Sequence, residues 1–136
     1  MVIKKDIQDI IDYSHRFAKK LLIEFKEYYP FGVAIDSKDN LIPIVYKDSE
    51  TDMPESQKLI DQLIKLGQTE LENHKIRAFG ITYDVRVNKD NSENKSDAIV
   101  IDIIHFENKN LPRYYFTYSW TKENKLVFGE SYGMDR

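Results

Sequence analysis

The sequence predicts an α+β domain in which two amphipathic helices pack on one face of a mainly antiparallel sheet. Apolar residues recur at helical spacing in two segments, and six shorter segments have the composition and alternation of strands. Turn-forming residues join most of these strands as hairpins, which makes them antiparallel. The predicted order is α-β-β-α-β-β-β-β, and a chain of 136 residues is expected to form a single domain, 1–136.

The first helix is predicted from Asp6 to Tyr29, because apolar residues follow steps of three and four up to Pro30. A proline disfavours helical geometry at the residue before it, so the helix is expected to stop there. Two short strands are predicted next, at 31–36 and 41–46. Pro43 cannot donate a backbone hydrogen bond, which indicates that the second of them is an edge strand or has its start there.

Residues 51–74 predict the second helix, and Asp52, Pro54 and Glu55 have the spacing of a helix start. Gly67 lies on its apolar stripe, where glycine costs about 1 kcal/mol relative to alanine. We therefore expect this helix to approach the sheet or the first helix closely at that point.

A long central hairpin is predicted from the segments 76–87 and 97–106. The first strand alternates between apolar residues and small or polar ones, which indicates one core face and one outer face. The second strand is apolar on both sides apart from Asp102, which is typical of a strand in the middle of a sheet.

The next predicted strand, 111–120, carries an aromatic row on one face, and a last short strand follows at 125–130. The length of the turn at Asn108 leaves two registers open. In the favoured one the row shares the core face with the isoleucines of the central strand; in the other it lies beside Asp102. The tail 131–136 is expected to be frayed. The row consists of Tyr114, Phe116, Tyr118 and Trp120.

Composition narrows the possible functions. The net charge is −3, without the basic excess that draws a domain to nucleic acid or to a membrane surface. No cysteine is present, which excludes disulfides and thiolate chemistry. The N-terminus has no unbroken apolar core of a signal peptide, and no run reaches the roughly 20 residues of a membrane span. We expect a cytoplasmic protein, without a cofactor or a metal site.

Three residues are the candidates for catalysis. If Tyr83 pairs near Ile101, then Asp84 and Asp102 become diagonal neighbours on the outer face of the hairpin, about 7–8 Å apart. Two carboxylates at that distance could act as an acid–base pair or bind a hard cation, although each could equally pair with an arginine. His105 ends the central strand and could act as a base, or be a hydrogen-bonded structural residue.

Four residues are candidates for ligand binding. Tyr28, Tyr29 and Phe31 surround Pro30 and form the densest aromatic segment of the chain. They could form the lip of a ligand pocket or a protein-contact surface, or simply join the first helix to the sheet. Thr82 lies beside the predicted carboxylate pair and would belong to the same site.

Four segments, EYYPFGVAID, RAFGITYDV, SDAIVIDIIHF and VFGE, give the chain its resemblance to small bacterial α+β proteins. In size, acidity and lack of catalytic motifs it also resembles the immunity proteins of bacterial toxin systems. That resemblance implies a non-enzymatic binding protein that docks a basic toxin domain. The alternatives are a small-molecule or metal-binding domain, or a modest enzyme, that uses the carboxylate pair. A third is a homodimer that pairs through the strand containing Pro43 or through the last strand.

Overall fold

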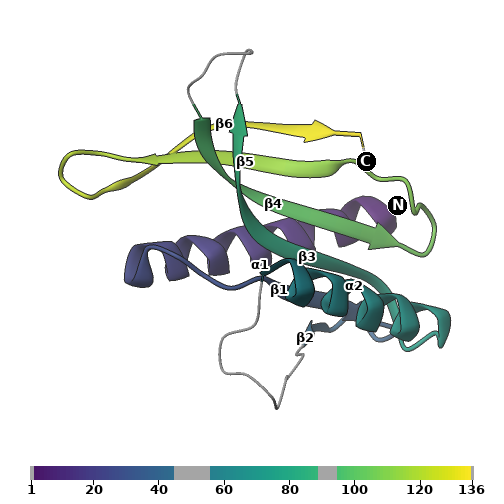
Figure 1. Ribbon diagram of the computed structural model, residues 1–136. Helices are drawn as coiled ribbons and strands as arrows, with labels where there is room; N and C mark the ends of the chain where they lie inside the picture. Colours follow the sequence, from purple (N-terminus) through teal and green to yellow (C-terminus); the bar gives the residue numbers. More distant parts are fainter. Residues whose placement is uncertain (1, 45–55, 89–94, 136) are drawn as a thin grey trace.

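A computed structural model describes residues 2–44, 56–88 and 95–135 of the chain (Figure 1). It confirms the α+β class and the predicted order of elements, with every strand pair antiparallel. The strand order across the sheet is β2-β1-β3-β4-β5-β6. In chain order the elements are α1 (Val2–Phe25), β1 (Phe31–Asp36), β2 (Leu41–Ile44), α2 (Ser56–Glu72), β3 (Ile76–Asn88), β4 (Lys95–His105), β5 (Arg113–Trp120) and β6 (Leu126–Met134).

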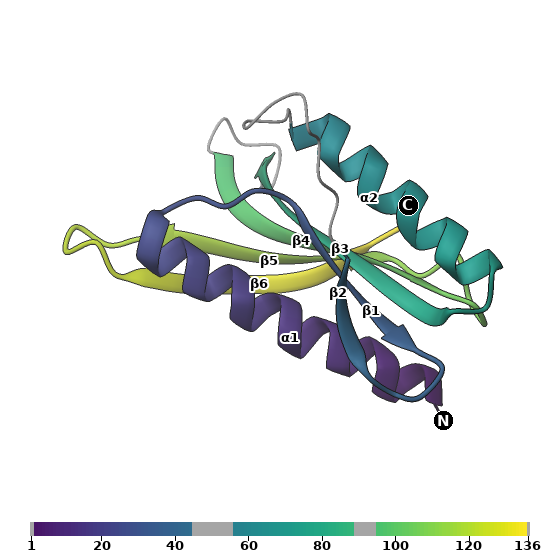
Figure 2. The same ribbon diagram turned by 90° about the horizontal axis from the view of Figure 1, so that it is seen from below.

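The prediction that both helices cover one face is wrong, because α1 and α2 lie on opposite sides of the sheet (Figure 2). One core cluster joins α1 to side chains such as Val33, Ile99 and Ile101. A separate cluster joins α2 to Phe79 and Ile81, which point to the other side of β3. Both faces of the central strands are therefore buried.

Glycine permits the close contact on each side of the sheet. A Cβ atom at Gly80 of β3 would lie 2.6 Å from Cγ2 of Ile10, so α1 rests directly on the face of β3 that was expected to be the outer one. A Cβ atom at Gly67 of α2 would lie 2.5 Å from the ring of Phe79, which confirms the predicted close approach to the sheet. Small residues on the second face of β3 thus mark a helix contact.

The fully buried line of α1 follows steps of four residues: Asp6, Ile10, Ser14, Ala18 and Leu22. The helix ends at Phe25, earlier than the predicted Tyr29. Lys26 adopts a left-handed conformation with φ of 64°, while its N–H still donates to the Leu22 carbonyl. Residues 27–30 then lead to β1, outside any helix or strand.

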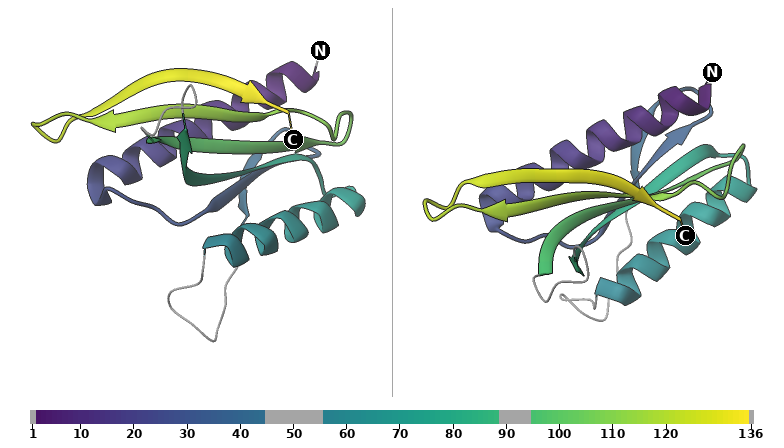
Figure 3. Two further views of the ribbon diagram at one scale, coloured as in Figure 1. Left: turned by 45° about the horizontal axis from the view of Figure 1, so that its top comes forward. Right: turned by 90° about the horizontal axis from the view of Figure 1, so that it is seen from above.

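The central position of β4 and the edge position of the strand with Pro43 are both confirmed by the strand order. The aromatic row also lies on the favoured side, since Tyr114 pairs with Ile101 and Phe116 with Ile99. The prediction of a frayed tail is wrong, because β6 continues to Met134 along β5. Figure 3 shows β6, in yellow, along the outer margin of the sheet.

Some expectations fall on residues outside the described ranges. They are the helix start at Asp52, Pro54 and Glu55, the strand positions 45–46 and the hairpin loop 89–94. Within the described residues, neither helix combines the length and the apolar character needed to cross a lipid bilayer.

Candidate functional site

The predicted carboxylate pair is not formed. In the observed register Ile81 faces Asp102 and Asp84 faces Ile99, which places the two carboxylates on opposite sides of the sheet. Tyr83 pairs with Val100, one residue away from the pairing that the prediction assumed. Since side chains alternate along a strand, this shift of one residue moves one partner to the other face.

Each aspartate has its own partner. Asp102 is nearly buried on the α2 side, and the guanidinium Nε of Arg113 on β5 lies 3.3 Å from its Oδ2. Asp84, on the α1 side, accepts a hydrogen bond of 2.8 Å from the Tyr118 hydroxyl. Asp84 is exposed when the whole residue is considered, but its carboxylate is partly buried. This burial raises the pKa of the carboxyl, and the hydrogen bond from Tyr118 offsets only part of the rise.

The third candidate, His105, lies in a fully buried network with Asp6. Its Nε2 is 2.8 Å from Oδ2 of Asp6, and its Nδ1 accepts a hydrogen bond of 3.1 Å from the N–H of Glu107. Since Nδ1 accepts, the proton of the neutral ring belongs on Nε2, which donates it to the carboxylate. Both nitrogens are therefore occupied, and the imidazole has no exposed surface from which to act on a substrate.

Arg77 completes this network. Its Nε and Nη2 each donate a 2.8 Å hydrogen bond to one oxygen of Asp6, and Nη1 forms an ion pair with Asp39. Burial alone would raise the pKa of the Asp6 carboxyl, but the hydrogen bonds and charges of Arg77 and His105 outweigh it and hold the pKa below its ordinary value. The network joins the start of α1 to β3 and β4, which gives it a structural role.

Sequence reasoning missed Asp6. Its position four residues before Ile10 on the buried line of α1 was the available signal. Its partners Arg77 and His105 are 71 and 99 residues away, so no local pattern could identify them.

Beside Asp84, three further hydroxyl-bearing residues belong to the α1 side of the sheet. Burial raises the pKa values of Tyr28 and Tyr118, and the nearby Asp84 charge raises them further. The hydroxyls of Tyr28 and Thr82 are buried, and neither has a hydrogen-bond partner among the described residues. Phe31 pairs directly with Thr82, so this group lies next to the start of β1.

A hollow in this region, the aromatic groove, has a volume of about 720 Å³. It includes three of the four predicted ligand-binding residues; the fourth, Thr82, lies beneath it next to Phe31. Its lining consists of Phe17, Leu21, Phe25, Glu27, Tyr28, Tyr29, Pro30, Phe31 and Ser56.

Part of a second apolar line on α1 builds one wall of the groove. Tyr13, Phe17, Leu21 and Phe25 follow steps of four, like the buried line, and the last three of them line the groove. The Phe17 and Phe31 rings meet edge to face with centroids 4.9 Å apart, which holds the wall against β1. Phe25 lies beyond that contact and remains 64% exposed.

The charge beside the groove is acidic. Among the described residues that line it, Glu27 is the only ionisable acid or base apart from the tyrosines. The neighbouring Lys26 is directed elsewhere, since its Nζ lies 4.3 Å from the centre of the Trp120 ring on β5. Glu24 is exposed one turn earlier on α1.

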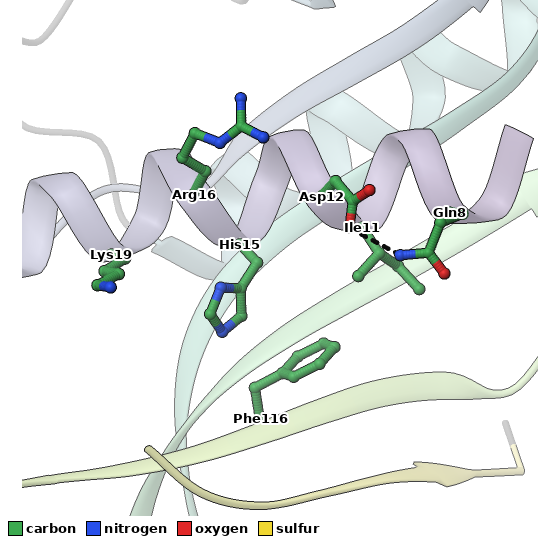
Figure 4. A pocket seen from close by; sticks show the side chains of 7 residues that line it. All are labelled: Gln8, Ile11, Asp12, His15, Arg16, Lys19 and Phe116. Carbon is green, nitrogen blue, oxygen red and sulfur yellow. Dashed lines mark hydrogen bonds between the residues drawn. The ribbon is translucent and has the colours of Figure 1, made fainter. Parts of the chain in front are cut away.

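A smaller hollow of about 460 Å³, the His15 hollow, lies between α1 and β5 (Figure 4). The His15 ring contacts Phe116 and Phe128, with centroids 5.0 Å and 4.5 Å away, and burial lowers its pKa. Its lining carries two cations, Arg16 and Lys19, and one carboxylate, Asp12, so charges of both signs are present.

No protein-family model, curated protein or solved structure matches the chain, so its function is inferred from the geometry of the site. Among the described residues, no group of three or more His, Asp or Glu side chains could hold a metal ion. The aromatic groove is therefore taken as the candidate site, because it combines a large apolar hollow with exposed aromatic side chains.

Proposed function

We propose that this protein is a non-enzymatic binding module that holds a basic segment of another protein in the aromatic groove. The observation that carries the proposal is the exposure of Phe25 and Tyr29, at 64% and 50%, on the rim of a groove with aromatic walls. Aromatic side chains dominate the energetics of protein interfaces, and apolar clusters exposed on a monomer commonly mark contact sites.

The charge of the groove determines the kind of partner. A segment with apolar side chains and a lysine or arginine would fill the groove and place its charge against Glu27. Glu24 adds a second negative charge nearby, which would assist the encounter of the two proteins. A basic domain of a toxin, as the similarity to immunity proteins implies, has this chemistry.

The arrangement of the ionisable residues favours binding over catalysis. The carboxylates of Asp84 and Asp102 are on opposite faces, so no acid–base pair is available between them. His105 is fully buried and hydrogen-bonded through both nitrogens.

A second candidate function, small-molecule binding in the same groove, is favoured by the volume of the groove, which lies within the roughly 300–1,000 Å³ typical of ligand sites.

A photo-crosslinking amino acid in place of Tyr29 tests the proposal in cells that make the protein. The same substitution at Leu41, which is 41% exposed on β2, is the control. The protein captured only from position 29 would then be purified and its affinity measured with the Glu27→Lys and Glu24→Lys variants.

We expect Glu27→Lys to weaken binding by about tenfold and to slow association, and Glu24→Lys to have the smaller effect of a charge outside the groove. Equal capture from positions 29 and 41 would contradict the proposal. A small molecule whose binding perturbs the groove resonances in NMR spectra, with no protein captured, would support the second candidate instead.

A further inference from the structure

β6 is one of the two edge strands of the sheet, and most of its residues are exposed. β6 spans nine residues without a proline, and Val127, Tyr132 and Met134 expose large apolar side chains. The opposite edge, β2, has four residues within the described part of the chain and includes Pro43, which cannot donate to another strand. An unprotected edge strand presents unpaired backbone groups to any strand that can match it.

The pattern of side chains along β6 restricts which strands can pair with its free edge. The register with β5 shifts between Phe116 and Tyr118, so Gly129 and Glu130 together face Thr117 in a β-bulge. Before the bulge, Leu126 and Phe128 point to the α1 side; after it, Ser131 and Gly133 do. The alternation is thus reversed once, in the middle of the strand.

The exposed apolar residues lie on the other side of the strand. Val127 pairs with Ser119, Tyr132 with Tyr115 and Met134 with Arg113, all directed to the α2 side. The rings of Tyr132 and Tyr115 are stacked, with centroids 5.2 Å apart. A strand added at this edge would therefore meet an apolar row formed by Val127, Tyr132 and Met134.

We propose that β6 pairs antiparallel with β6 of a second copy of the chain, with the twofold axis between Gly129 and Glu130. In this register Leu126 faces Gly133 of the second copy, Val127 faces Tyr132, and Phe128 faces Ser131. Each pair joins residues that point to the same side of the sheet, because both strands reverse their alternation at the axis. An ordinary unbulged strand could match only one half of β6.

The ends of the strand complete the register. Continuing it places Lys125, just before β6, opposite Met134 at the end of β6 in the second copy, and the twofold axis repeats this contact. The two Glu130 residues lie beside the axis and repel each other. The contact consists of one nine-residue strand from each copy, whereas stable complexes bury roughly 1,200–2,000 Å², so the dimer is expected to be reversible and concentration-dependent.

Sedimentation velocity over a concentration series tests the dimer. We expect Val127→Lys to weaken dimerisation by about tenfold, because the twofold axis places each substituted residue against Tyr132 of the other copy. The control is Leu41→Lys, the same kind of change on the opposite edge strand, which should leave the dissociation constant within about twofold. Glu130→Gln should tighten the dimer. A monomer at millimolar concentration would overturn the proposal, as would a dimer weakened only by Leu41→Lys.

The absence of cysteine from the chain allows the register to be measured. Val127→Cys with Tyr132→Cys should form a disulfide-linked dimer on mild oxidation, since facing residues lie within the Cα–Cα range of a disulfide. Val127→Cys with Met134→Cys is the control, with residues two positions out of register and too far apart to link. Faster linking of the control pair would overturn the proposed register. This inference does not depend on the proposed use of the aromatic groove.

Discussion

Removing the Asp6 carboxylate should destabilise the protein strongly, because it leaves a cation and a ring N–H without their common acceptor. The Asp6 side chain is 1% exposed and accepts three hydrogen bonds of 2.8 Å from Arg77 and His105. Loss of one partner from a buried ion pair typically costs about 3–5 kcal/mol. Arg77 is 18% exposed and retains Asp39, so we expect about 3 kcal/mol for Asp6→Ala, out of a typical total of roughly 5–15 kcal/mol.

The assay is urea unfolding followed by circular dichroism, with Asp9→Ala as the control. Asp9 is on the same helix, but its ion pair with Lys5 is exposed, so its removal should change stability little. A double-mutant cycle with Arg77→Ala should give a coupling of about 2 kcal/mol. If Asp6→Ala behaved like Asp9→Ala, or if the two substitutions were additive, the role of the network would be refuted.

The effect of Asp6 should also depend on pH. Its pKa in the folded state is below the ordinary value of 3.8, so the unfolded chain takes up the proton first as the pH falls. The stabilisation should therefore be complete above about pH 5 and disappear as the pH falls through the folded-state pKa. A difference between wild type and Asp6→Asn that stayed constant down to acid pH would contradict this.

Three more predictions concern the sheet. Gly67→Ala should lower the urea midpoint despite the better helix propensity of alanine, and Phe79→Leu should recover part of the loss; a raised midpoint would contradict the contact. Asp84 has a raised pKa, so its negative charge destabilises the folded state at pH values above its ordinary pKa. Asp84→Asn should therefore not lower stability at neutral pH, and a clear loss of stability there would contradict this prediction. Asp102→Asn should leave the response of the melting temperature to divalent cations unchanged, whereas a rise seen only in the wild type would indicate a metal site.

Local patterns in the sequence determined much of the fold. The apolar character of β4 on both sides predicted its central place, Pro43 predicted an edge, and Gly67 predicted a close contact. These features depend on a residue's own chemistry and on its immediate neighbours, which a single sequence contains.

The side of the sheet covered by each helix could not be predicted in the same way. Ala78, Gly80 and Thr82 have the small size of an outer face, but they also leave room for a helix, and Ile10 occupies that room. Only the pairing of distant segments distinguishes the two interpretations. The separation of Asp84 from Asp102 has a similar cause, because it depends on a register difference of one residue.

The candidate site was predicted in part. The aromatic segment around Pro30 indicated a pocket lip, and Tyr28, Tyr29 and Phe31 do line a groove. The other wall comes from Phe17, Leu21 and Phe25, which the sequence presents simply as core positions of a helix. Their partial exposure follows from the place where α1 crosses the sheet, which is a tertiary property.

The affinity of the captured partner for Phe25→Ser, compared with Ile23→Ser, tests the central claim most directly. Both residues are exposed apolar side chains near the end of α1, at 64% and 56%, but only Phe25 lines the aromatic groove. We predict that Phe25→Ser raises the dissociation constant by about thirtyfold, as expected for an aromatic hot spot, and that Ile23→Ser changes it by less than about twofold. Equal effects of the two substitutions would contradict the assignment of the groove as the binding site.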